Sequence, residues 1–390
     1  MNVVKFTYKV VTFGVLHTSP FCLFLMAYMR DMGLEISLIS AMMTVKKISR
    51  FVVDVPFGIL FDKIGAKNVM LISRIVKIVS FLLMLNIHNF TLFFLGIMLN
   101  GISYSAFYGK YNAYIYNVLK VEDKTKLFHK ITSLYYLIGD VYIVLISIFA
   151  MKVKAKFGYS FLILISCIPV AFSSMMLFFL PDNRLNNEKN KSFKLIIQKS
   201  IAFFKEKTYV LYFVIVSSIA SFFGWQAGIM TSIIMLDMGF KTDDTVKFGI
   251  YAKVLTGISS FVVYRLKKPF NIKSCFLMLN SSIFIFLCLA FIYKPQLIYV
   301  LVLYSLIHLF IQIGMEKHFE DILDQSIRGT LTSLSWLFST LISILITSLM
   351  SIVKHNGNFG YKNTMISIVA TMLVVCFVSS VLYLRKMPKE

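Results

Sequence analysis

The sequence predicts an all-α polytopic membrane protein, and three observations lead to this fold class. The 390-residue chain is 58% hydrophobic with a mean hydropathy of +0.78, whereas soluble domains are about 45–50% apolar. Apolar runs of about twenty residues, long enough to cross roughly 30 Å of hydrocarbon, recur from end to end. The runs are continuous, as in LISILITSLMSIV, and lack the alternation of barrel strands. Helices account for them because a helix satisfies its own backbone hydrogen bonds in lipid.

Dividing the apolar runs at their polar breaks gives about twelve spans. The first run follows Lys5 and Lys9 without a small-residue cleavage site, so we expect a retained span and not a signal peptide. The spans are expected near residues 11–29, 37–60, 68–87, 91–117, 130–151, 160–180, 209–236, 245–264, 274–293, 297–315, 331–352 and 364–384.

The longest polar interruption, residues 181–208, separates six expected spans from six more. We therefore divide the chain into an N-terminal six-helix bundle at 1–180, a cytoplasmic linker at 181–208 and a C-terminal six-helix bundle at 209–390. Within the linker, KSFKLIIQKSIAFFKEK places apolar residues at helical spacing. We expect this segment to lie along the membrane surface.

Basic residues set the expected orientation. If the N-terminus is cytoplasmic, most of the 40 Lys and Arg residues fall on the cytoplasmic side, and the positive-inside rule then places both termini in the cytoplasm. The net charge of +22 is explained by contact with anionic inner-leaflet lipids and needs no nucleic acid. We expect a multi-pass monomer in the inner (cytoplasmic) membrane.

The stretch DVPFGILFDKIGAK, residues 54–67, joins the second expected span to the third through a very short loop. Gly58 permits close helix approach, and Gly65 permits a turn with positive φ. Asp62 is an acid at an otherwise basic surface. It would accept hydrogen bonds from a helix N-terminus or pair with a basic side chain.

This stretch resembles the signature loop of the major facilitator superfamily, roughly G-x-L-x-D-x-x-G-[RK]-[RK]. The matching residues are Gly58, Leu60, Asp62, Gly65 and Lys67. YGKYNAYIYNVLK (108–120) resembles the end of span four in drug-exporter-like bacterial members. RGTLTSLSWL (328–337) resembles the opening of span eleven.

The resemblance implies two pseudo-symmetric six-helix bundles around a central cavity, with access alternating between the two membrane faces. It also implies that Asp62 breaks and remakes contacts between the bundles, with the start of span eleven near Arg328 as the partner region. Asn112 and Asn117 stand where related sequences often carry acids. Span five lacks the glycine-proline series of many proton-coupled drug exporters, so the usual export of cationic drugs is not implied.

Span two carries charges at mid-membrane depth. Lys47, Arg50 and Asp54 share one helix face, and Lys46 lies four residues before Arg50. One Lys, Arg or Asp at a helix centre costs about 2.5–3.5 kcal/mol on the insertion scale. We therefore expect these side chains to face a cavity or one another. A purely structural cluster, with Asp54 paired to Arg50 or Arg74, is the alternative.

Cations outnumber acids in the expected interior. The basic residues are Lys46, Lys47, Arg50, Arg74, Lys77, Lys110, Lys253 and Lys317, against Asp54, Asp140 and Glu316. The surplus requires anions, neutral lysines or snorkelling, and Lys110 and Lys317 are placed to snorkel. We hypothesise that the cavity accepts a solute with an anionic group, a carboxylate or a phosphate. The expected binding residues are Lys46, Lys47, Arg50, Lys110 and Lys253.

Three buried acids are candidates for carrying a coupling proton: Asp54, Asp140 and Glu316. A carboxylate in lipid favours its neutral form, so each could bind a proton during a transport cycle. For Asp140 the alternative is a salt bridge to Lys110 or Arg50 that only fixes the N-terminal bundle.

Other polar side chains complete the expected cavity. His308 and Gln312 share a face of span ten with Glu316, and Gln226 falls in a similar region of span seven. His17 precedes the kinking Pro20 and either contacts solute or is satisfied within the interior.

We therefore predict a secondary active transporter that moves a small organic solute by proton-coupled efflux, and we hypothesise that the solute is anionic. Import of an anionic nutrient by proton symport is the alternative, and a lipid-modifying membrane enzyme or a non-transporting sensor is less favoured. The spacing of Cys, His, Asp and Glu shows no catalytic or metal-ligand pattern, so we expect no enzyme activity, cofactor or metal.

Overall fold

The computed structural model describes residues 3–86, 88–107, 110–181, 193–226, 231–232, 235–236, 238–266, 270–292, 298–323, 328–356 and 361–387. Every regular element in these ranges is a helix, which confirms the all-α prediction. The first half of the chain contains α1 (Val3–Val15), η1 (Pro20–Leu23), α2 (Leu25–Asp31), α3 (Ile36–Ile64), α4 (Ala66–Met84), α5 (Phe90–Ser105), α6 (Lys110–Val121), η2 (Thr125–Leu127), α7 (Phe128–Met176) and η3 (Leu177–Phe179).

The second half begins after the linker helix α8 (Phe193–Glu206). It contains α9 (Thr208–Ser221), the π-helical turn η4 (Phe222–Gln226), α11 (Thr242–Arg265), α12 (Ile272–Ile292), α13 (Ile298–Ile322), α14 (Arg328–Asn356) and α15 (Tyr361–Lys386).

The elements follow the expected order of spans, with two differences. Span one begins near Val3 and not residue 11, and it is interrupted between α1 and η1 because Pro20 starts a new 3₁₀ turn. Span four is divided between α5 and α6. Spans five and six both lie within α7, as two helices that meet at a kink where Gly158 has φ 78°, so the predicted break between them is present.

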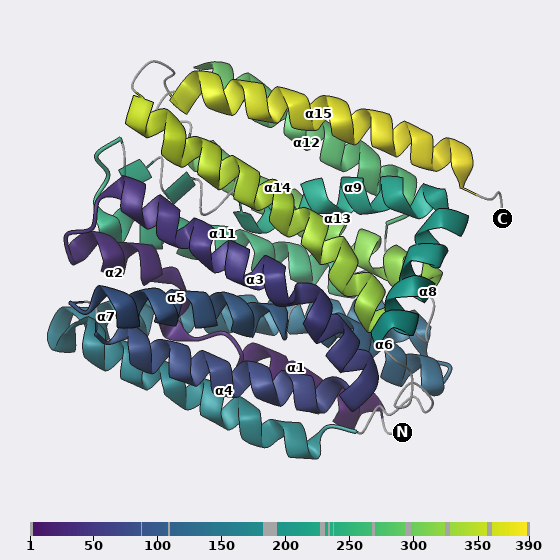
Figure 1. Ribbon diagram of the computed structural model, residues 1–390, viewed down its shortest axis with the longest axis horizontal. Helices are drawn as coiled ribbons and strands as arrows, with labels where there is room; N and C mark the ends of the chain where they lie inside the picture. Colours follow the sequence, from purple (N-terminus) through teal and green to yellow (C-terminus); the bar gives the residue numbers. More distant parts are fainter. Residues whose placement is uncertain are drawn as a thin grey trace.

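The two halves pack side by side along their length (Figure 1). Their closest helix pairs are α3 with α14 and α7 with α11. Both chain termini and α8 lie at the same end of the bundle in Figure 1. We call this the terminal end and the opposite end the far end.

Outward faces of the bundle carry large apolar side chains. Leu145 is 64% exposed, Leu277 70% and Phe178 80%. Such broad apolar surface suits contact with lipid. Among the described residues, five helical stretches are long and apolar enough to span a bilayer by composition alone: Phe90–Val121, Thr125–Phe179, Thr242–Arg265, Ile272–Phe291 and Ile366–Lys386. Helix α3 falls outside this set because its central charges lower its hydropathy.

Candidate transport site and gates

The terminal end is held by a contact between α3 and α14. Helix α3 ends at Ile64, and Gly65 has φ 88°, which lets α4 begin at once with Ala66. The positive φ expected at Gly65 is confirmed. Asp62, in the last turn of α3, accepts hydrogen bonds at Oδ2 from the backbone N–H of Thr330 (2.9 Å) and from its hydroxyl (2.7 Å). A carboxylate is favoured there because the first N–H groups of α14 have no helical acceptor.

Arg328 also lies at the terminal end, but its hydrogen-bond partners differ from those of Asp62. Its Nη1 donates to Asn117 Oδ1 (2.8 Å), and its Nη2 donates to the carbonyl oxygen of Glu320 (3.1 Å). The Glu320 carboxylate lies 3.4 Å from Nε. Arg328 is fully buried. It therefore joins the second half of the chain to α6 of the first.

A third contact at the terminal end was not expected from the sequence. The hydroxyl of Tyr116 donates to Asp321 Oδ1 (2.5 Å), and Lys317 pairs with the same carboxylate. The remaining signature residues support the turn: Gly58 is buried in α3, and Lys67 lies in the first turn of α4.

The far end has its own contact between the halves, which sequence reasoning missed. Lys154 of α7 lies 2.9 Å from Asp31 and 3.1 Å from Asp243 of α11. Asp31 also accepts hydrogen bonds from Tyr159 (2.6 Å) and Thr242 (2.9 Å). Burial opposes the charged form of Asp31, but the hydrogen bonds from Tyr159, Lys154 and Thr242 outweigh it and hold the pKa of Asp31 below its usual value.

Between the two ends, α7 and α11 are linked by an ion pair. Lys253 Nζ lies 2.9 Å from Asp140 Oδ1, and Asp140 is 5% exposed. The partner of Asp140 is therefore Lys253 of the other half, and the expectation of Lys110 or Arg50 is wrong. The difference arises because α11 packs directly on α7, a neighbour that spacing within one half cannot reveal.

The charged side chains of α3 contact α5 and α6 of the first half and α14 of the second. Asp54 is fully buried and lies 3.5 Å from both Arg50 and Lys110, and Ser105 donates a 2.6 Å hydrogen bond to it. One carboxylate is thus shared by two cations. The Arg50 guanidinium also stacks 5.1 Å from the ring centroid of Trp336 on α14.

Arg74 belongs to a different cluster inside the first half, so the expected alternative pairing with Asp54 does not form. It contacts the His17 ring and Ser173, the latter by a 2.9 Å hydrogen bond, and stacks on Phe107 (4.3 Å). Lys77 donates to the His17 carbonyl oxygen (2.7 Å). His17 is therefore buried within the first half, in contact with Arg74 through its ring and with Lys77 through its carbonyl oxygen.

Two lysines of α3 occupy different surroundings. Lys46 Nζ lies 4.6 Å from the ring centroid of Tyr104, a cation–π contact. Lys47 is 6% exposed and buried within the bundle.

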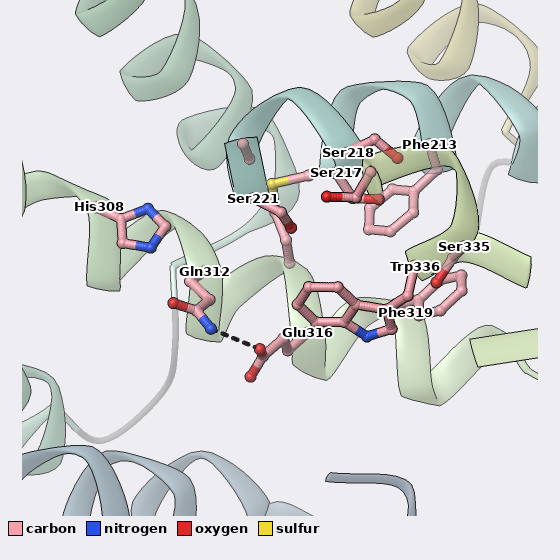
Figure 2. Close-up of a pocket in the computed structure, with 13 residues that line it drawn as sticks. Phe213, Ser217, Ser218, Ser221, His308, Gln312, Glu316, Phe319, Ser335 and Trp336 are labelled. Carbon is pink, nitrogen blue, oxygen red and sulfur yellow. Dashed lines mark hydrogen bonds between the residues drawn. The ribbon is translucent and has the colours of Figure 1, made fainter. Parts of the chain in front are cut away.

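The second half contains a cavity of about 60 Å³ between α9, α13 and α14. Figure 2 shows His308, Gln312 and Glu316 along α13, facing serines of α9 and Trp336 of α14. Gln312 Nε2 donates to Glu316 Oε1 (2.8 Å) and to the hydroxyl of Tyr136 on α7 (2.9 Å). The side chain of Gln226, also expected here, lies outside the described part of the structure.

The cavity volume admits a few water-sized groups. No cluster of three His, Cys, Asp or Glu side chains suited to a metal occurs in the described ranges.

A helical bundle of two halves, with polar contacts between them at both ends and charges between, is the architecture of a membrane transporter. The family model of the Major Facilitator Superfamily matches residues 12–347. The chain belongs to the major facilitator superfamily.

Solved structures share this fold at low sequence identity. The human organic anion transporter MFSD10 (TETRAN) superposes with a TM-score of 0.73 at 12% identity, covering 97% of this chain and 100% of that one. A bacterial homologue of the iron transporter ferroportin, outward-facing, gives 0.70 at 13% identity with full coverage (100%) of both. The proton:xylose symporter XylE gives 0.71 at 13%, covering 99% and 96%. No curated protein matches the sequence significantly.

Proposed function

We propose that the protein is a secondary active transporter that moves a small organic solute bearing an anionic group, by alternating access and in exchange for protons. The observation that carries this proposal is the pair of contact sets at opposite ends of one charged interface. Asp62–Thr330 joins the halves at the terminal end, and Lys154–Asp243 joins them at the far end. The hydrogen bonds and ion pairs of each set contribute about 0.5–3 kcal/mol each and are reversible.

The anionic group is supported by the charge of the first half. Asp54 is shared by Arg50 and Lys110, which leaves one positive charge uncompensated within that cluster. Lys46 contacts an aromatic ring and is half-buried. An anion at the interface of the halves lowers the energetic cost of these buried cations.

Glu316 is the strongest candidate for the coupling proton. Asp54 and Asp140 both lie within 4 Å of a Lys or Arg, and such a cation stabilises the ionised acid. Among the described side chains, Glu316 has hydrogen bonds from Gln312 and Tyr136 and no cation at ion-pair distance. An acid in this setting accepts a proton more readily than one beside a lysine.

Efflux is supported by the resemblance of residues 108–120 to exporter-like members of the family. We place the protein in the cytoplasmic membrane as a monomer, with both termini and the basic helix α8 against the anionic inner leaflet. The charged residues are spread over both halves and do not gather at one membrane surface, which favours transport over lipid-modifying chemistry.

Flux in proteoliposomes tests the proposal. Liposomes containing the purified protein would be loaded with labelled organic anions and zwitterions, and pH gradients of either sign would be imposed. Antiport predicts that solute moves opposite to the proton gradient. Solute movement along the gradient would indicate symport and import. Absence of gradient-dependent flux for every solute, despite specific binding, would contradict transport and favour a sensor.

A further inference from the structure

The cavity in the second half presents hydrogen-bond acceptors that lack donors. In its ionised form the Glu316 carboxylate only accepts hydrogen bonds, and the Gln312 amide then turns its Nε2 toward it. Gln312 Oε1 then points away, and it is buried without a hydrogen-bond partner in the described structure. Buried polar atoms in folded proteins normally have a partner, so this oxygen indicates a missing one.

His308 adds a second unsatisfied group one helical turn earlier. It is 4% exposed and interacts with the Gln312 side chain, although neither ring nitrogen meets the distance and angle of a full hydrogen bond to a described residue. The ring sits against Gly224, where an added Cβ would lie 1.7 Å from His308 Cε1. The close backbone therefore holds the ring at the cavity wall, with one nitrogen available as an acceptor.

The rest of the wall suits a positively charged group. Serine hydroxyls of α9 and α14 face the cavity, and Ser217, Ser218 and Ser335 donate to their own helices. Their lone pairs remain available to a ligand. Phe213, Phe319 and Trp336 supply aromatic surface. A carboxylate, acceptor oxygens and aromatic rings together match an ammonium group, which has only donors and binds aromatic faces.

A positive charge lies on the other side of Trp336 from the cavity. Arg50 stacks 5.1 Å from this ring, and its Nη2 is buried with no hydrogen-bond partner in the described ranges. The Arg50–Asp54–Lys110 cluster carries a net positive charge, whereas the cavity beyond Trp336 carries only an acid.

We infer that the transported solute is amphoteric, with an ammonium group bound by Glu316, Gln312 and His308 and an anionic group bound by Arg50. This inference rests on the proposed function and specifies its substrate class. The cavity of about 60 Å³ accommodates the ammonium group. The anionic end would occupy the interface between α3 and α14 once the halves separate. Glu316 exchanges its proton for the solute ammonium, so a net neutral solute is moved against one proton.

Matched trios of small molecules test the inference. Each trio contains a zwitterion, its analogue without the amine, and its analogue with the acid converted to an amide. Phenylalanine, 3-phenylpropionate and phenylalaninamide form one trio. Alanylalanine and 3-aminopropylphosphonate are the zwitterions of two further trios. Binding to the full-length protein in nanodiscs would be measured by thermal shift and calorimetry. We expect the zwitterion to bind at least about tenfold more tightly than either analogue, because each analogue lacks one of the two charge-assisted contacts.

Two variants test which residue binds each charged group of the solute. Glu316→Gln should abolish the preference for the zwitterion over the deaminated analogue, and Arg50→Gln should abolish the preference over the amide. Glu206→Gln changes an exposed acid of α8 and serves as the control. A variant that unfolds is recognised by its melting curve, and Glu316→Asp then replaces Glu316→Gln, with a reduced preference expected.

The outcomes separate the inference from the proposed function. Equal binding of zwitterion and deaminated analogue in every trio, no binding by any trio member, or unchanged preferences in Glu316→Gln would overturn the amphoteric class. Flux of simple anions in the proteoliposome assay would in that case still uphold transport.

Discussion

Asp62 of α3 caps the N-terminus of α14 in the opposite half of the molecule, through the backbone N–H and the hydroxyl of Thr330. An N-cap of this kind contributes about 0.5–2 kcal/mol. Asp62→Ala should therefore loosen the terminal end. We expect faster hydrogen exchange at residues 330–332, while solute binding is retained and transport slows.

Asp62→Asn keeps an acceptor oxygen without the charge, so it should have an intermediate effect. Glu206→Gln should leave exchange unchanged. If exchange in α14 is the same in Asp62→Ala as in the wild type, Asp62 does not hold this gate.

Gly101 sets the distance between α5 and α3. A Cβ at Gly101 would lie 2.1 Å from the carbonyl oxygen of Lys46, a backbone atom that cannot rotate away. Gly101→Ala should destabilise the first half by about 1–3 kcal/mol or more, seen as a lower melting temperature in detergent. Gly139→Ala is the matched control, because its Cβ would approach only Val15, at 4.0 Å. Equal melting temperatures for the two variants would show that the helices are not this close.

The Asp140–Lys253 pair joins α7 to α11. Removal of one partner leaves a charge in a partly buried site, so Asp140→Asn and Lys253→Gln should each lower stability by up to about 3–5 kcal/mol. The double variant should recover part of this loss, since neither charge remains. A double-mutant cycle on melting temperature measures the coupling. Strictly additive effects would argue against a direct ion pair.

The far-end contact should resist mild acid. Asp31 lies beyond the expected first span, and its pKa is held below the usual 3.8. A lowered folded-state pKa adds stability that is complete above the unfolded value and is lost as pH falls through the folded value. The stability difference between wild type and Asp31→Asn should therefore be constant from pH 8 to pH 5 and shrink only below pH 3.8. A difference that disappears near pH 6 would place the titration on another group.

The fold was predictable from sequence because lipid imposes one solution on long apolar runs. The turn at Gly65 was predictable for a similar reason: a two-helix junction that short needs a residue with positive φ. Helix boundaries were less accurate. The break between spans five and six was accurate, because the two helices of α7 meet at a kink at Gly158.

Partners across the two halves could not be predicted. Asp140 was assigned to cations of its own half, although its ion pair is with Lys253. The sequence also did not predict the contacts between the halves that are made by Thr330, Tyr116 and Lys154. No local sequence pattern distinguishes these residues from ordinary polar residues. The paired acids Asp243 and Asp244 at the start of α11 did carry a signal of helix capping.

The central claim is that the two halves separate alternately at the terminal and far ends. Electron–electron double resonance in a cysteine-free background tests it, with spin labels at Asn68 and Arg385 for the terminal end and at His88 and Lys247 for the far end. We predict reciprocal changes: conditions that lengthen one distance, such as a change of pH or added zwitterion, shorten the other. Two distances that stay single-valued and fixed under all these conditions would contradict the account.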